Sequence, residues 1–101
     1  VVANGSDVVS CTSESDNAYN SFSGTSMSTA SATGSVALLY QLQNTLQPGV
    51  TLLSSTIKGI LIHTASDLGN TGPDYQFGWG LLNIKAAADL IYDNSNRNYK
   101  I

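Results

Sequence analysis

The run Gly24-Thr25-Ser26-Met27-Ser28 has the residue types and spacing of a serine nucleophile at the start of a helix. A serine hydroxyl is a weak nucleophile at its own pKa, so it needs a neighbouring base and donors for the developing oxyanion. The first turn of a helix has unpaired backbone N–H groups, and its dipole favours negative charge. The run therefore predicts that Ser26 is a nucleophile whose own N–H is one oxyanion donor. A simpler interpretation is an ordinary helix cap, which serine commonly supplies.

The residues after the nucleophile predict a helix over 26–46 that is surrounded by other protein. No charged residue occurs between Ser26 and Gln47, and residues 30–37 are almost all Ala, Ser, Thr or Gly. A helix without a charged face is normally buried on all sides. A chain of 101 residues has little material for that. The pattern indicates that more protein belongs around this helix.

The rest of the chain predicts short strands and two further helices. Residues 1–25 contain two β-branched runs, 1–3 and 8–10, and a polar loop over 12–21 that leads to the nucleophile. Residues 47–92 predict a helix from Ser54 or Ser55, one of which caps it, to about Ala65, and a short Gly-interrupted β segment over 75–82. They also predict a helix from Ile84 to about Tyr92, capped by Asn83. Residues 93–101 form a polar tail that we expect to fray.

Composition excludes several classes of function. Hydrophobic residues make up 42% of the chain, charged residues 11%, and the net charge is −3. Nucleic-acid binding needs a clustered cationic face, but the basic residues are scattered at Lys58, Lys85, Arg97 and Lys100. No apolar run approaches the ~20 residues of a membrane span, and no signal peptide is expected within these residues. The single Cys11 excludes an internal disulfide and is expected to be a bystander.

Longer stretches of the sequence resemble the subtilisin-like serine proteases. Gly24–Ser28, the small-residue helix and Gly34, eight residues after Ser26, are similar to the active-serine signature of that family. Residues 1–8 resemble the strand and turn that precede the signature. Residues 74–83 resemble the closing segment, and Ala86-Ala87-Ala88 the terminal helix. Two positions depart from the family, because Ala30 and Asn4 stand where it usually has Pro. We expect a modest loss of rigidity there and no loss of chemistry.

The resemblance implies an α/β parent fold with three layers around a parallel sheet, of which residues 1–101 are a C-terminal, helix-rich segment of about three helices and short strands. It implies an endopeptidase that forms an acyl-enzyme at Ser26. It also implies near-site roles for Thr25, whose hydroxyl is expected near the oxyanion, and for Met27, which is expected to be sensitive to oxidation. Phe22 and Ser23 would bind substrate on the leaving-group side, and Gly24 would let the substrate backbone come close. Simple core packing remains an alternative for Phe22 and Met27.

The base and its orienting carboxylate are expected upstream of residue 1, because the family order is Asp, His, Ser. This chain alone is therefore expected to be inactive. His63 is the single histidine, and the resemblance places its helix behind the central one, away from Ser26. A dipole or capping role is expected for it instead. Asp67, Asn70 and Asp74 match no calcium-binding pattern, so no metal or cofactor is expected in this segment. Structural calcium elsewhere in the parent protein is compatible with the resemblance.

The expected partners are a polypeptide substrate, the rest of the catalytic domain and, as the resemblance allows, an upstream propeptide. The resemblance also implies a secreted or cell-surface protein. Two alternatives to an enzyme segment stay open. One is a degenerate protease fold retained as a binding or structural module, which the departure at Ala30 supports slightly. The other is a self-contained helical domain with a fortuitous motif, which the uncharged helix disfavours.

Overall fold

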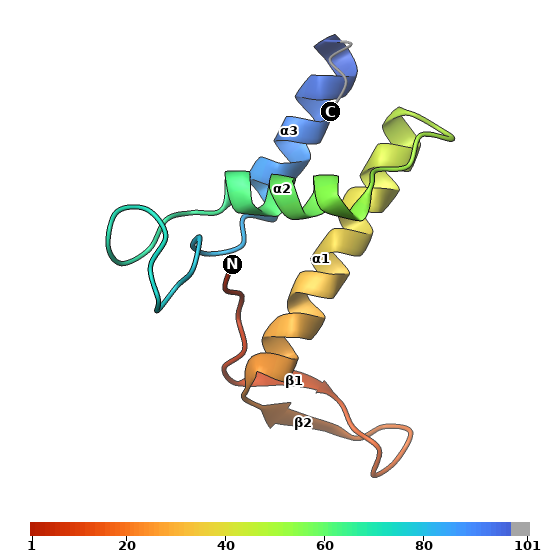
Figure 1. Ribbon diagram of the computed structural model, residues 1–101. Helices are drawn as coiled ribbons and strands as arrows, with labels where there is room; N and C mark the ends of the chain where they lie inside the picture. Colours follow the sequence, from red (N-terminus) through yellow and green to blue (C-terminus); the bar gives the residue numbers. More distant parts are fainter. Residues whose placement is uncertain (98–101) are drawn as a thin grey trace.

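The computed structural model describes residues 1–97, which form a two-stranded hairpin and three helices. The strands are β1 (Val8–Cys11) and β2 (Tyr19–Phe22), and the helices are α1 (Thr25–Leu46), α2 (Ser54–Thr64) and α3 (Ile84–Arg97). Figure 1 shows α1 as the long axis, with the hairpin at its N-terminal end and α2 crossing its C-terminal half. The helix α3 packs against both α1 and α2. The arrangement is flat, measuring 48 × 38 × 18 Å.

The hydrophobic core lies where the three helices meet, at the C-terminal half of α1. Its buried members come from α1, the following loop, α2 and α3: Leu39, Leu52, Ile57, Ile60, Ala87 and Ile91. The side chain of Gln43 is also buried there and donates to Gln47 Oε1 at 3.0 Å. This bond gives the Gln43 amide a partner, and a buried amide without one would lower the stability of the fold. The core therefore fixes the far end of α1 and leaves its N-terminal half to other contacts.

The N-terminal half of α1 is mostly exposed although it carries no charge. Thr29, Ala30 and Gly34 are exposed, and just beyond this half Leu38 is 59% exposed. Serine and threonine hydroxyls in this half donate to carbonyl oxygens one turn earlier, as Thr29 does to Thr25 and Thr33 to Thr29. Such bonds satisfy the hydroxyls within the helix. Residues 1–97 alone leave this apolar half of α1 uncovered.

The hairpin corrects the predicted loop over residues 12–21. The strands pair antiparallel with Val8 opposite Phe22 and Cys11 opposite Tyr19, so only residues 12–18 connect them. Within this connection, the N–H of Thr12 donates to the carbonyl of Ala18 at 3.0 Å. Asn20 and Ser21 are poor strand formers by type, but pairing with β1 determines their conformation because β propensity depends strongly on context. Because the segment is polar, its composition predicted a loop where β2 forms.

The predicted strands at residues 1–3 and 75–82 are isolated bridges in the structure. The N–H of Val2 donates to the carbonyl of Gly80 at 2.9 Å, and the N–H of Leu82 donates to the carbonyl of Val2 at 2.8 Å. Leu81 also pairs with Ser66 on its other side. Gly80 has a φ of 113°, and a Cβ there would lie 2.3 Å from the carbonyl oxygen of Ser66. The positive φ and this close approach stop a longer ladder from forming.

Three helix ends differ from the prediction. The helix α1 begins at Thr25, one residue before the predicted start. Neither Ser54 nor Ser55 caps α2, because Leu53 occupies the cap position and no side chain bonds the end. The helix α3 continues past Tyr92 to Arg97, so the first part of the predicted tail is helical, with a basic residue in its last turn. The remainder of that tail, 98–101, lies outside the described residues.

Asn83 caps α3 as predicted, and Asp74 organises the loop that precedes it. The side-chain oxygen of Asn83 accepts from the N–H of Ala86 at 3.0 Å. The Asp74 carboxylate accepts from the N–H groups of Phe77 at 2.7 Å, Gln76 at 2.9 Å and Asn70 at 3.1 Å. These bonds, led by that of Phe77, lower the pKa of Asp74 below its ordinary value of 3.8, and burial opposes them.

This carboxylate predicts an acid-sensitive loop. A depressed pKa means that the stabilisation is complete above pH 3.8 and is lost as the pH falls through the folded pKa, below that value. We expect the amide proton of Phe77 to titrate with a midpoint below 3.8 when its chemical shift is followed by NMR. An Asp74→Asn variant should show no such titration, because the amide keeps an acceptor but carries no charge. A midpoint above 3.8, or the same titration in the variant, would contradict this role for Asp74.

Candidate active site

Ser26 is the second residue of α1 and its side chain is exposed. Gly24 precedes the helix with φ 153° and ψ 171°, a conformation that is essentially restricted to glycine. The carbonyl of Gly24 accepts from the N–H groups of Met27 at 3.2 Å and Ser28 at 3.4 Å. The N–H groups of Thr25 and Ser26 find no acceptor within residues 1–97. The helix therefore starts with free donors at the predicted nucleophile, which is the arrangement that an oxyanion requires.

A second glycine, distant in sequence, supports this turn. The N–H of Gly24 donates to the carbonyl of Gly5 at 2.7 Å. A Cβ on Gly5 would lie 2.1 Å from Ser28 Oγ and 2.5 Å from the carbonyl oxygen of Gly24. Any larger residue at position 5 would therefore displace the start of α1. Gly5 was not among the predicted site residues, although it lies within residues 1–8, the segment that resembles the family.

Ser23 joins the two ends of the hairpin just before the predicted nucleophile, Ser26. Its hydroxyl accepts from the N–H of Asp7 at 2.9 Å. Asp7 has a φ of 50°, which is uncommon for a residue other than glycine. The hydrogen bond of Ser23 therefore links the turn that enters β1 to the segment that leaves β2. The hairpin and the start of α1 are held together by Ser23 and by the Gly5–Gly24 contact.

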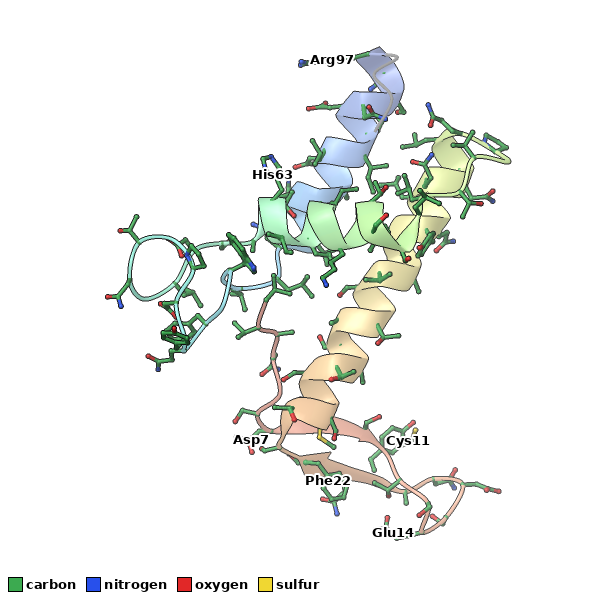
Figure 2. The ribbon with its side chains drawn as sticks, in the orientation of Figure 1. Asp7, Cys11, Glu14, Phe22, His63 and Arg97 are labelled. Carbon is green, nitrogen blue, oxygen red and sulfur yellow. The ribbon has the colours of Figure 1, made fainter. Side chains whose placement is uncertain are left out.

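A groove of about 660 Å³ lies between the hairpin and the first turns of α1. Ser26 and Met27 line it from the helix, and Phe22 lines it from β2. Phe22 is 48% exposed, and Met27 is half-buried. Figure 2 shows Phe22 and Cys11 on the hairpin, beside the start of α1. The structure thus brings three of the predicted site residues to one groove, whereas Ser23 and Gly24 connect strand and helix without lining it.

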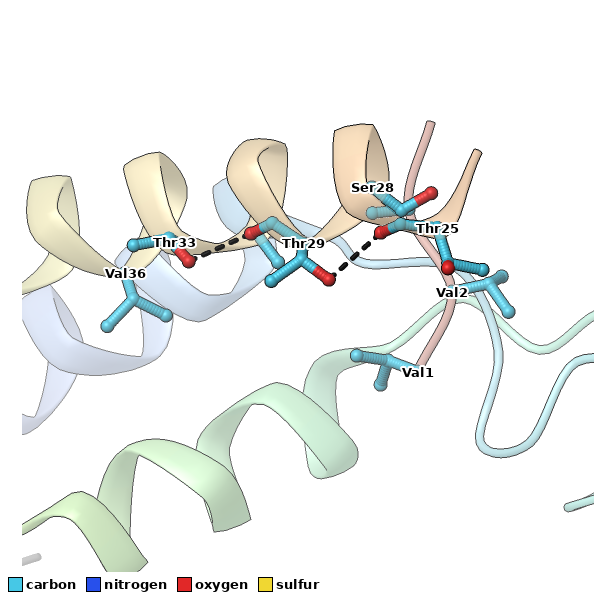
Figure 3. A pocket seen from close by; sticks show the side chains of 9 residues that line it. Val1, Val2, Thr25, Ser28, Thr29, Thr33 and Val36 are labelled. Atoms are coloured by element: carbon cyan, nitrogen blue, oxygen red, sulfur yellow. Dashed lines mark hydrogen bonds between the residues drawn. The ribbon is translucent and has the colours of Figure 1, made fainter. Parts of the chain in front are cut away.

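Thr25 lies along a different hollow, of about 560 Å³, between the N-terminal segment and another face of α1. Figure 3 shows Thr25, Thr29 and Thr33 along the helix with Val1 and Val2 opposite. The hydroxyls of Thr29 and Thr33 are bonded within the helix, so the lining is uncharged and largely apolar. The role predicted for the Thr25 hydroxyl near the oxyanion stays a prediction.

The other titratable residues considered in the sequence lie elsewhere. His63 is exposed in the last turn of α2, and Figure 2 places it far from Phe22 and the start of α1. The carboxylates of Asp67 and Asp74 accept loop N–H groups, the former from Gly72 at 2.8 Å. Within residues 1–97, no three potential metal ligands gather at one place. No helix in this described range is long and apolar enough to cross a membrane.

Comparison with known proteins identifies the family. The sequence profile of the subtilase family of peptidases matches residues 1–80, which include the hairpin, the turn at Gly24 and α1. The chain belongs to the subtilase family. This confirms the resemblance on which the sequence analysis relied, and it places Ser26 within the matched region.

The subtilase relatives are much longer than this chain. It is 38% identical over 66 residues to serotype-specific antigen 1 of Mannheimia haemolytica, a match that covers 65% of this chain and 6% of that protein. It is also similar to the crystal structure of Apa1, a psychrophilic subtilisin-like protease of the Antarctic psychrotroph Pseudoalteromonas sp. AS-11. That match has 30% identity and a TM-score of 0.61, and it covers 76% of this chain and 16% of the other. The described residues are thus a helix-rich part of a subtilisin-like α/β fold.

Proposed function

We propose that this chain supplies the nucleophile and one oxyanion donor of a subtilisin-like serine endopeptidase whose His and Asp lie upstream. The observation that carries the proposal is the position of Ser26. It is exposed at the start of α1, its N–H has no acceptor within residues 1–97, and its side chain lines a groove. In a chain of the subtilase family, this position fits a nucleophile better than an ordinary helix cap.

The proposed reaction divides peptide hydrolysis into two steps. The Ser26 hydroxyl attacks the scissile carbonyl while the upstream histidine takes its proton, and the backbone N–H of Ser26 donates to the resulting oxyanion. The histidine then returns the proton to the leaving amine as the peptide bond breaks, which leaves an acyl-enzyme. Water attacks this ester, the histidine again accepts a proton, and the free acid and Ser26 are regenerated. Phe22 lines the groove and would contact the leaving-group side of the substrate, whereas Ser23 and Gly24, which do not line it, would connect the strand to the nucleophile.

The uncovered half of α1 supports the view that this chain is one segment of a larger catalytic domain. The hollow along Thr25 and Thr29 and the exposed Leu38 are uncharged surfaces that a folded domain normally buries. We infer that the rest of the catalytic domain covers them and supplies the base, so this chain alone is inactive. A secreted or cell-surface location fits the family, and the name of the relative from M. haemolytica agrees with it.

The proposal is tested with a fluorophosphonate probe, which forms a bond with an activated serine. The chain is produced together with the coding sequence upstream of Val1, and separately without it. We expect labelling at Ser26 in the longer protein and none in the shorter one, because an isolated serine lacks its base. Peptide mapping by mass spectrometry identifies the labelled residue.

The alternative is a protease fold that has lost catalysis and acts as a binding or structural module. It is favoured by Ala30, which lines the same groove and departs from the proline usual in the family. If the longer protein folds but takes up no probe, or takes it up at another serine, the alternative is correct. The sequence upstream of Val1 also distinguishes the two functions, because an active protease requires intact Asp and His motifs there.

A further inference from the structure

The charge of this chain is unevenly distributed along the sequence. Residues 1–57 contain no Lys, Arg or His, and their acidic residues all fall in or next to the hairpin, at Asp7, Glu14 and Asp16. The remaining residues carry equal numbers of Asp and of Lys plus Arg, so the formal charge of −3 belongs to the hairpin region. The hairpin forms one wall of the groove that Ser26 lines. This side of the proposed cleft is therefore anionic.

The groove combines an apolar lining with a single carboxylate. Val8, Phe22 and Met27 line it near the nucleophile, and Glu14 lines it from the turn of the hairpin. Figure 2 shows Glu14 at the tip of the hairpin, beyond Phe22 and Cys11. No basic side chain lines the groove. A peptide that leaves Ser26 along the groove thus passes apolar side chains first and reaches the carboxylate afterwards.

Glu14 is held in place but keeps hydrogen-bonding capacity. Its Oε2 accepts from the Thr12 hydroxyl, which leaves Oε1 without a partner among the described residues. The only ion pair within residues 1–97 is that of Lys85 with Asp89, so no described cation neutralises Glu14. Carboxylate oxygens pair readily with the ammonium of Lys and the guanidinium of Arg. An oriented and unneutralised carboxylate in a substrate groove is a recognition element for such a group.

We propose that Glu14 gives the leaving-group side of the cleft a preference for substrates with a basic side chain beyond the first leaving-group residue. The inference rests on the proposed function, because it takes Ser26 as the nucleophile and the groove as the path of the leaving group. The apolar residues near Ser26 accept the first leaving-group side chain, and Glu14 binds the ammonium or guanidinium that follows. Glu14 is exposed, so its attraction is moderate and depends on salt.

The test uses the full-length protease and quenched fluorescent peptides with one fixed acyl side. Lys, Gln and Glu are placed in turn at each of the first three leaving-group positions. We expect kcat/KM to be roughly two- to five-fold higher for Lys than for Gln at the second or third position, as an exposed ion pair provides. The preference should disappear in Glu14→Gln and shrink in high salt. It should persist in Asp16→Asn, which removes the same charge from a residue outside the groove.

Fluorophosphonate labelling of each variant separates failure of this inference from failure of the proposed function. If Ser26 is labelled but Lys gives no advantage, or the advantage survives Glu14→Gln, the specificity inference is wrong and the protease assignment stands. If Asp16→Asn abolishes the preference equally, a general field and not the groove carboxylate causes it, which also overturns the inference. If Glu14→Gln lowers the melting temperature and leaves the preference for Lys unchanged, Glu14 supports the fold and not substrate recognition, and the inference is wrong. Absence of labelling in the wild type overturns both.

Discussion

On the proposed function, replacing Ser26 with alanine in the full-length protein should lower kcat by roughly a million-fold, the loss seen when the nucleophile of subtilisin itself is removed. That magnitude belongs to subtilisin and is transferred to this chain through membership of the same family. The change removes one hydroxyl from an exposed position on α1. It leaves the backbone N–H of residue 26 in place. The variant should therefore keep its fold and its affinity for substrate, and retain the part of catalysis due to binding and the oxyanion donor.

The matched control is Ser35→Ala, which removes the same group from the same helix. The Ser35 hydroxyl donates to the Ser31 carbonyl at 2.9 Å, and Ser35 lines neither the groove nor the hollow beside Thr25. Its kcat and fluorophosphonate labelling should match those of the wild type. Thermal melts of both variants show whether the fold is intact. If Ser26→Ala retained wild-type kcat, Ser26 would not be the nucleophile, and the nucleophile would lie elsewhere.

Local sequence was sufficient to predict the family and the start of α1 to within one residue. The Gly-Thr-Ser-Met-Ser run, the uncharged small-residue helix and the Asn83 cap are features of neighbouring residues, and α1 and the cap of α3 correspond to them. The N-terminal half of α1 is a further case. The absence of charged residues from this helix predicted that other protein surrounds it, and residues 1–97 leave its N-terminal half exposed. Periodicity and capping act over a few residues, so they can be inferred without the fold.

Pairing between distant residues could not be predicted. Residues 19–21 have the composition of a loop and become a strand because β1 lies opposite them. Residues 1–3 and 75–82 have the composition of strands, but glycines with positive φ limit them to single bridges. These bridges connect Val2 to Gly80 and Leu82, while Gly5, three residues after Val2, contacts Gly24. The closing segment of the chain is thereby tied to the start of α1, a connection that no local pattern contains.

On the proposed function, this connection makes Gly5 a positioning residue for Ser26, and Gly5→Ala is the second large effect that we expect. The new Cβ would lie 2.5 Å from the Gly24 carbonyl oxygen, so the backbone itself must move. That carbonyl accepts from the N–H groups of Met27 and Ser28, which enclose Ser26 in the first turn. A displacement of the reacting atoms by about 1 Å is enough to cost roughly a hundred-fold in rate. We expect a loss of that order in kcat and in the rate of fluorophosphonate labelling.

The separation of kcat from KM distinguishes positioning from general destabilisation. Gly5 does not line the groove, so KM should change little while kcat falls. The matched control is Gly59→Ala, an exposed helical glycine with nothing within 4 Å of an added Cβ. This control should raise stability by about 0.5–1 kcal/mol and leave kcat unchanged. If Gly5→Ala lowers the melting temperature but the folded variant is labelled at the wild-type rate, Gly5 supports the fold without positioning Ser26. A lower labelling rate at temperatures where the variant is fully folded would support a displaced first turn of α1, because the added Cβ contacts the Gly24 carbonyl and Ser28 and leaves the Ser26 side chain itself unchanged.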